Sequence, residues 1–198
     1  MRSYINSILS LEKLEYTGGL KIMHHLSLIE SRMGTGQVKD KITRPCTGLK
    51  IAPHYSCHSL RPSGIMEFDN PLAPALPGKI IALTGAHTMD WPEKTECCGA
   101  PLFGINQAVS RKIADKKIAG AKRVSADFIG VSCPWCYMQF QKVQELTLLE
   151  RIQAGKSREP ALPAILYIQL LGLATGLEPR DLGLGNGELH PGILTAGE

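Results

Sequence analysis

The chain has 198 residues, a formal net charge of +4 and 43% hydrophobic residues, a composition that is ordinary for a soluble globular protein. The mild charge, spread along the chain with few aromatic residues between the basic ones, argues against a nucleic-acid partner. No signal peptide is expected from the first residues, which begin a mixed helical pattern. The longest apolar stretch, residues 161–177, is interrupted by proline and glycine, so it predicts a buried core helix rather than a membrane span.

Residues 1–44 predict two helical pieces and contain no cysteine. Apolar residues recur at near-helical spacing in residues 5–11 and again in residues 20–29, with a glycine-containing break at 17–19. Two further glycines in residues 34–36 are expected to end the second piece. We interpret residues 1–44 as an appendage or a fragment of a larger unit, and residues 45–198 as the main domain.

The main domain predicts alternating strands and helices. The expected elements are a strand at 49–55, a short helix at 79–83, a strand at 87–91, a helix at 103–124, a strand at 127–132 and a helix at 134–153. The expected apolar face of the long helix is formed by Ile105, Val109, Ile113 and Ile118. This alternation indicates an α/β domain with a small, mostly parallel sheet flanked by helices. The strands at 49–55 and 127–132 lead to Cys57 and Cys133, and open α/β sheets place their sites at these C-terminal ends.

Five of the six cysteines follow a distinctive spacing. The pattern is Cys57, 39 residues, Cys97-Cys98-Gly99, 34 residues, then Cys133-Pro134-Trp135-Cys136. A Cys-x-x-Cys at a strand-to-helix turn allows both sulfurs to reach one metal centre, and the helix dipole lowers the pKa of thiolates there. A disulfide between adjacent cysteines is strained, so the Cys-Cys pair is better suited to holding neighbouring irons. Gly99 is expected to leave room beside a bulky cluster.

The spacing leaves other interpretations open. A structural zinc site needs four ligands, which would leave a fifth cysteine over. A thioredoxin-like redox pair at Cys133 and Cys136 would leave the Cys97-Cys98 pair unexplained. Buried thiols without a function are a further alternative. Clustered cysteines in a chain without an export signal indicate a reducing compartment, so the expected location is cytoplasmic.

The motifs resemble the cysteine-rich CCG module of the heterodisulfide reductase B subunit and its relatives, in particular the second half of that protein. The resemblance extends over roughly residues 20–190. Besides the cysteines, it is carried by residues 48–52, 54–62, 68–71, 94–100 and 169–174. It implies that Cys57, Cys97, Cys98, Cys133 and Cys136 bind a non-cubane four-iron four-sulfur cluster. It also implies two electron-transfer partners, a ferredoxin-like iron–sulfur subunit and a flavoprotein subunit, and a disulfide as the substrate.

One departure from the family is evident, because its full-length members have two CCG modules and this chain has one. Residues 1–44 are then expected to be a helical linker or the remnant of a preceding module. Residues 45–198 are expected to be the CCG iron–sulfur domain. A second CCG module, from a separate chain or a second copy, is therefore an expected partner. The alternatives are a truncated gene and a cluster that works without the family's full chemistry.

Four residues outside the five cysteines are weighed separately. His54 and His58 flank Cys57 and are candidate proton donors during disulfide cleavage, with a structural hydrogen-bonding role as the alternative. Lys94 is a candidate for attracting an anionic substrate or balancing cluster charge, with a surface or capping role as the alternative. Cys46 lies outside the motif and is expected to be a free thiol. The basic residues at 111–123 are interpreted as the solvated face of an amphipathic helix rather than a docking site for an acidic partner.

The sequence thus favours an iron–sulfur subunit of a heterodisulfide-reductase-like complex that transfers electrons to reduce a disulfide. Two alternatives remain. One is an iron–sulfur electron carrier without a substrate of its own, and the other is a zinc-stabilised interaction module.

Overall fold

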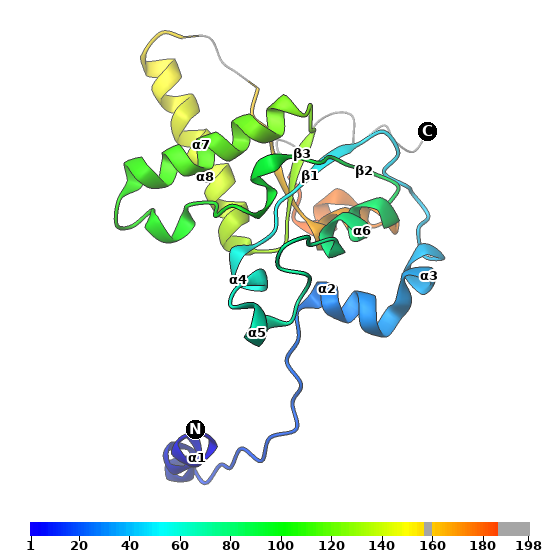
Figure 1. Cartoon of the computed structure of the whole chain (residues 1–198), viewed down its shortest axis with the longest axis vertical. Coiled ribbons are helices and arrows are strands. Elements are labelled where there is room, and N and C mark those ends of the chain that lie inside the picture. The colour runs from blue at the N-terminus through cyan, green and yellow to red at the C-terminus, as the bar shows by residue number, and fades with distance from the viewer. Residues whose placement is uncertain (157–159, 186–198) are drawn as a thin grey trace.

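A four-stranded parallel sheet lies at the centre of the protein (Figure 1). The computed structural model describes residues 1–156 and 160–185, so the predicted main domain at 45–198 is described only within these ranges. The strands are β1 (Lys50–Pro53), β2 (His87–Thr88), β3 (Phe128–Val131) and β4 (Ala164–Leu166). They lie side by side in the order β2-β1-β3-β4, and all neighbouring pairs are parallel. The predicted α/β class is confirmed.

Helices cover both faces of the sheet. The α-helices are α1 (Arg2–Leu9), α2 (His25–Leu28), α3 (Gly34–Lys39), α4 (Cys57–Leu60), α5 (Ser63–Met66), α6 (Leu76–Leu83), α7 (Gln107–Arg123), α8 (Pro134–Gln153) and α9 (Tyr167–Ala174). The shorter turns are η1 (Ser10–Glu12), η2 (Ile29–Met33), η3 (Pro92–Thr95), η4 (Ala100–Leu102) and η5 (Pro179–Leu182). Within the described ranges, no helix combines the length and the apolar character that crossing a membrane requires.

Alternate residues of the central strands build two separate cores. Ile51 and Phe128 point to one face, where they pack with α6 and α9. Their neighbours Ala52 and Ile129 point to the other face and pack with α7 and α8. Figure 1 shows α7 and α8 on one side of the sheet and α6 on the other. Because both faces are covered, every residue of β3 is buried, which explains why its sequence is a continuous apolar run.

The N-terminal segment differs from the prediction. α1 has no buried residue and is joined to the rest by an extended stretch (Figure 1). The second helical piece begins at His25 rather than near residue 20, and it continues through residues 34–36 instead of ending there. The N–H of Leu26 donates to Nδ1 of His24 at 3.2 Å, which caps α2, and Leu26 and Val38 are buried in the α6–α9 core. Tertiary packing therefore outweighs the low helix propensity of glycine.

The long helix α7 begins four residues later than predicted. The side chain of Asn106 accepts a hydrogen bond from the N–H of Val109 at 3.1 Å and fixes the start of the helix. Ile105 precedes the helix and is 83% exposed, and Val109 is exposed as well, so neither belongs to the apolar face. The residues that α7 buries are Ser110, Ala114, Lys117, Ile118, Gly120 and Ala121.

The apolar stretch at 161–177 is not a single core helix. Its first part forms β4, and the N–H of Ile129 in β3 donates to the carbonyl of Pro163 at 2.9 Å. Its second part forms α9. A short apolar run does not distinguish a fully buried strand from a buried helix, because both lack an exposed face. The strand expected at 87–91 is likewise reduced to β2, which has two residues at the edge of the sheet.

Candidate metal centre

Three neighbouring strands each lead to a cysteine-bearing loop at their carboxyl end. Cys57 begins α4 after β1, the Cys97-Cys98 pair lies between η3 and η4 after β2, and Cys133 is the N-cap of α8 after β3. Because β2, β1 and β3 are parallel neighbours, the three loops meet at one edge of the sheet. The five cysteines are Cys57, Cys97, Cys98, Cys133 and Cys136. All six cysteines of the chain are free thiols.

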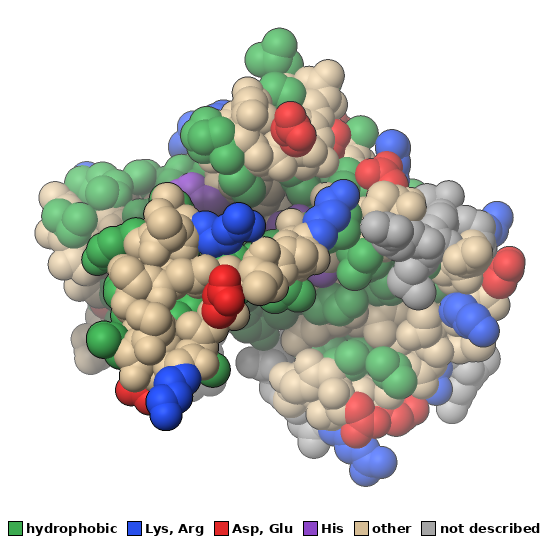
Figure 2. All heavy atoms as spheres, turned by 90° about the horizontal axis from the view of Figure 1, so that it is seen from below, with side chains coloured by type: hydrophobic (Ala, Val, Ile, Leu, Met, Phe, Trp, Pro, Cys, Tyr) green, Lys and Arg blue, Asp and Glu red, His purple; other side chains and the backbone are tan. Residues whose placement is uncertain are grey.

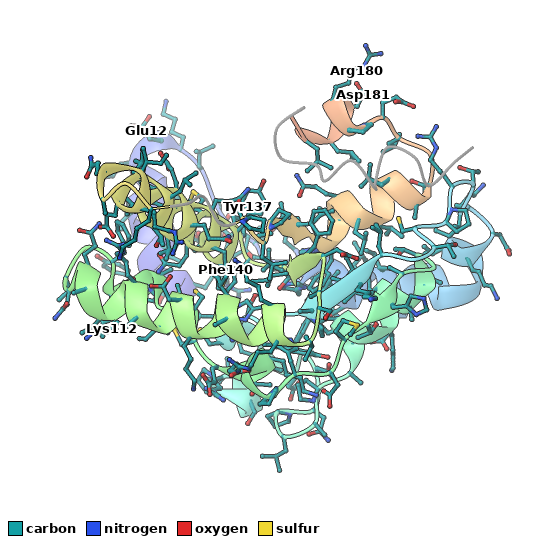
Figure 3. The ribbon with its side chains drawn as sticks, turned by 90° about the horizontal axis from the view of Figure 1, so that it is seen from above. Glu12, Lys112, Tyr137, Phe140, Arg180 and Asp181 are labelled. Carbon is teal, nitrogen blue, oxygen red and sulfur yellow. The ribbon has the colours of Figure 1, made fainter. Side chains whose placement is uncertain are left out.

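The innermost part of the site combines two cysteines and a histidine. Ligand atoms of His54, Cys98 and Cys136 all lie within 4.8 Å of one another, and all three residues are buried. The Nε2 atom of His54 lies 3.3 Å from Sγ of Cys136. His54 also packs edge-to-face against Phe140, which is buried on the inward side of α8 (Figure 3). This arrangement matches the donor set of a site for a transition metal.

The thiols of Cys98, Cys133 and Cys136 shift one another's pKa values. A hydrogen bond from Cys136, assisted by one from His54, lowers the pKa of Cys98 to about 4 despite its burial. A hydrogen bond from Cys136 also lowers the pKa of Cys133 to about 6, together with backbone N–H groups of the first turn of α8. The pKa of Cys136 is raised, because Cys133 and Cys98 take the negative charge beside it. Ready formation of thiolates is what metal binding requires.

Cys57 and Cys97 complete the group on its outer side. Burial raises the pKa of Cys57, and the neighbouring Cys97 and Cys98 raise it further. Cys98 and Cys136 are only 2% and 3% exposed, whereas Cys57, Cys97 and Cys133 are partly exposed. The five cysteines therefore form one continuous group with a buried side and a side open to solvent.

Gly99 has a different role from the one predicted. Its φ of +86° lies in the left-handed region, and a Cβ atom there would lie 2.7 Å from the backbone oxygen of Ser110 in α7. The hydroxyl of Ser110 donates to the carbonyl of Gly99 at 2.8 Å, and Gln139 of α8 donates to that hydroxyl at 2.8 Å. Gly99 thus allows the cysteine loop to approach α7 closely, and the room it leaves faces the helix.

The three candidate catalytic residues lie in different surroundings. His54 is buried against Cys136, and burial lowers its pKa to about 4 despite the opposing hydrogen bond with Cys98, so it is neutral at pH 7. His58 is exposed in α4, one residue after Cys57. Nζ of Lys94 is paired with Asp90 at 2.6 Å. The structure therefore places His54 against the cysteines and His58 at their open side, and the ammonium group of Lys94 forms an ion pair with Asp90.

Sequence reasoning missed Lys117, which belongs to the basic run assigned to a solvated helix face. Lys117 is completely buried, and its Nζ lies 4.7 Å from the ring centre of Trp91. The available signal was its position three residues after Ala114 and four before Ala121, on the stripe of small residues that α7 buries.

Cys46 lies in the other core, apart from the five cysteines. Burial raises the pKa of its thiol to about 11, which is typical of an unreactive buried cysteine.

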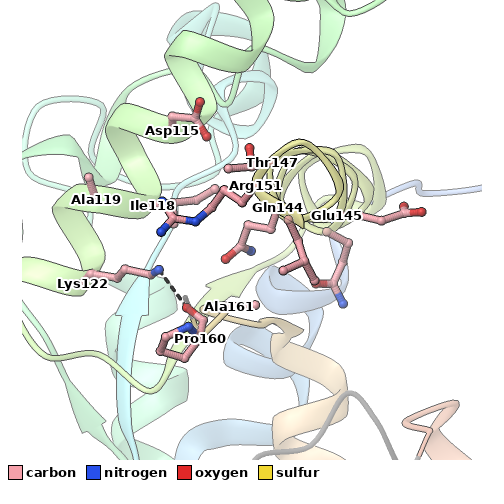
Figure 4. A pocket seen from close by; sticks show the side chains of 12 residues that line it. Asp115, Ile118, Ala119, Lys122, Gln144, Glu145, Thr147, Arg151, Pro160 and Ala161 are labelled. Carbon is pink, nitrogen blue, oxygen red and sulfur yellow. Dashed lines mark hydrogen bonds between the residues drawn. The ribbon is translucent and has the colours of Figure 1, made fainter. Parts of the chain in front are cut away.

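Two hollows lie near α8. A cavity of about 410 Å³ between α7 and α8 is lined by residues such as Asp115, Lys122 and Arg151 and contains none of the five cysteines (Figure 4). A smaller apolar hollow of about 140 Å³ includes Trp135 and Met138 in its lining, directly beside the Cys-x-x-Cys motif. Seen from the side of α1, the surface carries hydrophobic side chains spread among charged ones (Figure 2).

Comparisons with known proteins agree with this geometry. Residues 51–141 match the family CCG, described as a cysteine-rich domain, and this segment holds all five cysteines. The B subunit of the ferredoxin/F420H2-dependent CoB-CoM heterodisulfide reductase of Methanosarcina acetivorans is 32% identical over 186 residues, which cover 93% of this chain and 60% of that protein. The membrane anchor subunit of 8-methylmenaquinol:fumarate reductase of Wolinella succinogenes is 28% identical, with 93% of this chain and 63% of that protein covered.

A solved structure shows a similar fold. A hypothetical protein from Helicobacter pylori superposes with a TM-score of 0.59 at 15% identity, over 92% of this chain and 32% of that one. The resemblance to the heterodisulfide reductase B subunit that the motifs predict is confirmed. The chain spans about 60% of the length of the curated relatives that it matches.

Proposed function

From the similarity to the heterodisulfide reductase B subunit, we propose that this chain is an iron–sulfur redox subunit of a heterodisulfide-reductase-like complex. The observation that carries the proposal is the meeting of five free thiols from three loops at the carboxyl edge of the sheet. The proposed ligands of a non-cubane four-iron four-sulfur cluster are Cys57, Cys97, Cys98, Cys133 and Cys136.

The donor set fits an iron–sulfur cluster better than a zinc ion. A structural zinc ion is satisfied by four ligands, whereas the three loops carry five free thiols and the His54 imidazole lies against Cys136. Cys98 and Cys133, whose pKa values are lowered to about 4 and about 6, supply negative charge to the site. Soft thiolates are the usual ligands of iron–sulfur clusters, so the chemistry of the donors agrees with the proposal.

Each group of the chain has a distinct part in this proposal. The bound cluster would supply one-electron transfer to a disulfide substrate. Cys98 and Cys136 hold the buried side, where the aromatic rings of Trp91 and Phe140 keep water away. The N-terminus of α8 stabilises negative charge on Cys133. His58 at the open side is the proposed source of the proton that each released thiolate needs.

The whole complex is also part of the proposal. The 198 residues contain one CCG match, and we propose that a second CCG module takes part in the complex. The proposed electron donors are a ferredoxin-like iron–sulfur subunit and a flavoprotein subunit. Residues 1–44 are proposed to be a linker or the remnant of a preceding module, and 45–198 the cluster-binding domain. Six free thiols favour a reducing compartment, and the proposed location is the cytoplasm.

A second candidate function is an electron carrier without a substrate of its own. It is favoured by the similarity to the fumarate reductase anchor protein, whose name does not include a disulfide. Both candidates require the cluster, and they differ only in whether the open side of the five cysteines meets a disulfide or another electron carrier.

Anaerobic purification tests the proposal. The protein should be brown, contain iron and acid-labile sulfide in similar amounts and give an electron paramagnetic resonance signal after oxidation or reduction. Turnover of a heterodisulfide by the reconstituted complex would then distinguish the first candidate from the second. A colourless protein with one zinc ion per chain would contradict both and support the zinc-stabilised module.

A further inference from the structure

A buried positive charge lies in the middle of α7. Lys117 is 0% exposed, and among the side chains whose burial the structure describes it is the only buried lysine or arginine. Its neighbours on the helix, Ala114, Ile118 and Ala121, belong to the same core as Cys98 and Cys136. A lysine is almost never fully buried unless something compensates its charge, so the contacts of Lys117 need an explanation.

The closest contacts of Lys117 are neutral groups. Its Nζ donates a hydrogen bond to the backbone carbonyl of Glu93 and lies 4.7 Å from the ring centre of Trp91. Trp91 is itself fixed, since its Nε1 donates to the carbonyl of Pro53 at 2.8 Å. Among the described residues, no carboxylate forms an ion pair with Lys117.

The nearby carboxylate of Glu93 is paired with another cation. Its Oε1 lies 2.6 Å from the guanidinium of Arg123. The carboxylate packs against α7 at Gly120, where a Cβ atom would lie 2.5 Å from Oε2. Arg123 therefore offsets part of the charge of Glu93, and the charge of Lys117 also acts on other anions.

The anions that face Lys117 include the buried thiols. Burial lowers the pKa of Lys117 to about 8, and the negative charges of Glu96, Cys98, Cys136 and Glu93 oppose this shift. Lys117 also lowers the pKa of His54, whose ring touches Cys136 at 3.3 Å. The ammonium group, which lies over the ring of Trp91, thus shares a core with Cys98 and Cys136, in surroundings that screen charge weakly.

We propose that Lys117 is a positioning residue whose buried charge raises the reduction potential of the group held by the five cysteines. The inference rests on the proposed function, because it concerns an electron-accepting group at that site. An added electron makes the group more negative, and a fixed cation nearby stabilises this reduced state. The carbonyl of Glu93 and the ring of Trp91 hold the cation in place without neutralising it.

The test compares two lysines that are adjacent on α7. Lys117→Gln removes the buried charge and replaces the ammonium group by a neutral amide, which is also a hydrogen-bond donor for the carbonyl of Glu93. Lys116→Gln is the matched control, since Lys116 is exposed and pairs with Glu96 at 2.8 Å. Lys117→Met is a second neutral variant, in case Gln disturbs the packing. Each full-length protein, purified anaerobically, is titrated with dithionite and redox mediators while electron paramagnetic resonance follows the reduction.

We expect both neutral Lys117 variants to be reduced at a potential lower by about 59 mV or more, which corresponds to tenfold in a one-electron equilibrium. Lys116→Gln should remain close to the unmodified protein. Equal potentials in all the proteins, or an equal shift at both lysines, would overturn the inference. Folded Lys117 variants that bind no iron would also overturn it, since Lys117 would then be needed for assembly. An unmodified protein without iron would instead contradict the proposed function.

Discussion

The imidazole of His54 lies 3.3 Å from the sulfur of Cys136, and this contact joins the end of β1 to the first turn of α8. A second contact does the same nearby, because the hydroxyls of Ser56 and Ser132 lie 2.8 Å apart. Both contacts connect segments that are more than 70 residues apart in the sequence. The site therefore depends on the sheet that aligns these segments, and its ligands and its fold should be tested together.

The first prediction concerns the ligands. Cys98→Ser should lose or convert most of the cluster, because Cys98 contributes a buried thiolate with a pKa of about 4 and a serine hydroxyl is not ionised at neutral pH. Iron content and electron paramagnetic resonance measure the loss. Cys46→Ser is the matched control, since Cys46 lies in the other core and should leave both measurements unchanged. Full retention of the native signal in Cys98→Ser would argue against the five-ligand assignment.

Removal of the metal should loosen the three cysteine loops selectively. The ligands extend from Cys57 to Cys136, so metal binding connects segments that are distant in the sequence. Hydrogen exchange of the metal-free protein should show faster exchange in these loops, whereas α7 should keep its protection because it packs on the sheet. Unchanged exchange in the loops would mean that the site is preformed without metal.

The stability of the metal-free protein should fall as the pH falls from about 6.5 toward 4, in part through His24. Burial, assisted by the neighbouring His25, lowers the pKa of His24 from 6.5 to about 4, and its Nδ1 must be unprotonated to accept the N–H of Leu26. Since the unfolded chain binds the proton and the folded chain does not, stability is present above pH 6.5 and lost below it.

Urea unfolding at several pH values measures this dependence. His24→Asn should reduce the loss of stability on acidification, because asparagine caps a helix without titrating. His87→Asn, at an exposed histidine, is the control and should keep the slope of the unmodified protein. An equal slope in His24→Asn would show that other groups account for the pH dependence.

Gly99→Ala should destabilise the protein by about 1–3 kcal/mol, the range expected for a strained backbone position. The new Cβ would have a positive φ and would approach the carbonyl of Ser110 to 2.7 Å. Denaturant unfolding measures the change. Gly104→Ala is the control, because no atom lies within 4 Å of its Cβ position and it should be nearly neutral. A neutral Gly99→Ala would mean that the loop and α7 separate easily.

The isolated chain should show negligible disulfide reductase activity with an artificial electron donor. A single one-electron centre would have to hold a half-reduced disulfide, whereas two centres complete the reaction. Trp135 and Met138 are 69% and 50% exposed beside the Cys-x-x-Cys motif, which gives a second module an apolar surface to pack on. Activity should appear when that module is added. Robust turnover by a monomer, verified by light scattering during the assay, would show that one module suffices.

Local sequence patterns predicted several elements well. α8 has the predicted bounds, since Pro134 begins it and Gly155 adopts a positive φ just after its end. β1 and β3 were found as apolar runs that lead to Cys57 and Cys133. Hydrophobic periodicity predicts the wrong element at 161–177, where the buried segment has no polar face. An apolar run without a polar face is compatible with both a buried strand and a buried helix. It also predicted Ile105 and Val109 on the apolar face of the helix, whereas Ile105 precedes the cap at Asn106 and Val109 lies on the exposed side of the first turn.

By itself, the sequence determined the number, the type and the spacing of the thiols, and hence the family resemblance and the preference for soft metals. Only the tertiary structure decided how those thiols are distributed, with Cys98 and Cys136 inside and Cys57, Cys97 and Cys133 at the open side. It also decided that Lys117 is buried while the adjacent Lys116 is exposed. The physical reason is that the residue types alone define which ligand atoms are present. The burial of those atoms and the charges around them depend on which distant segments a parallel sheet aligns.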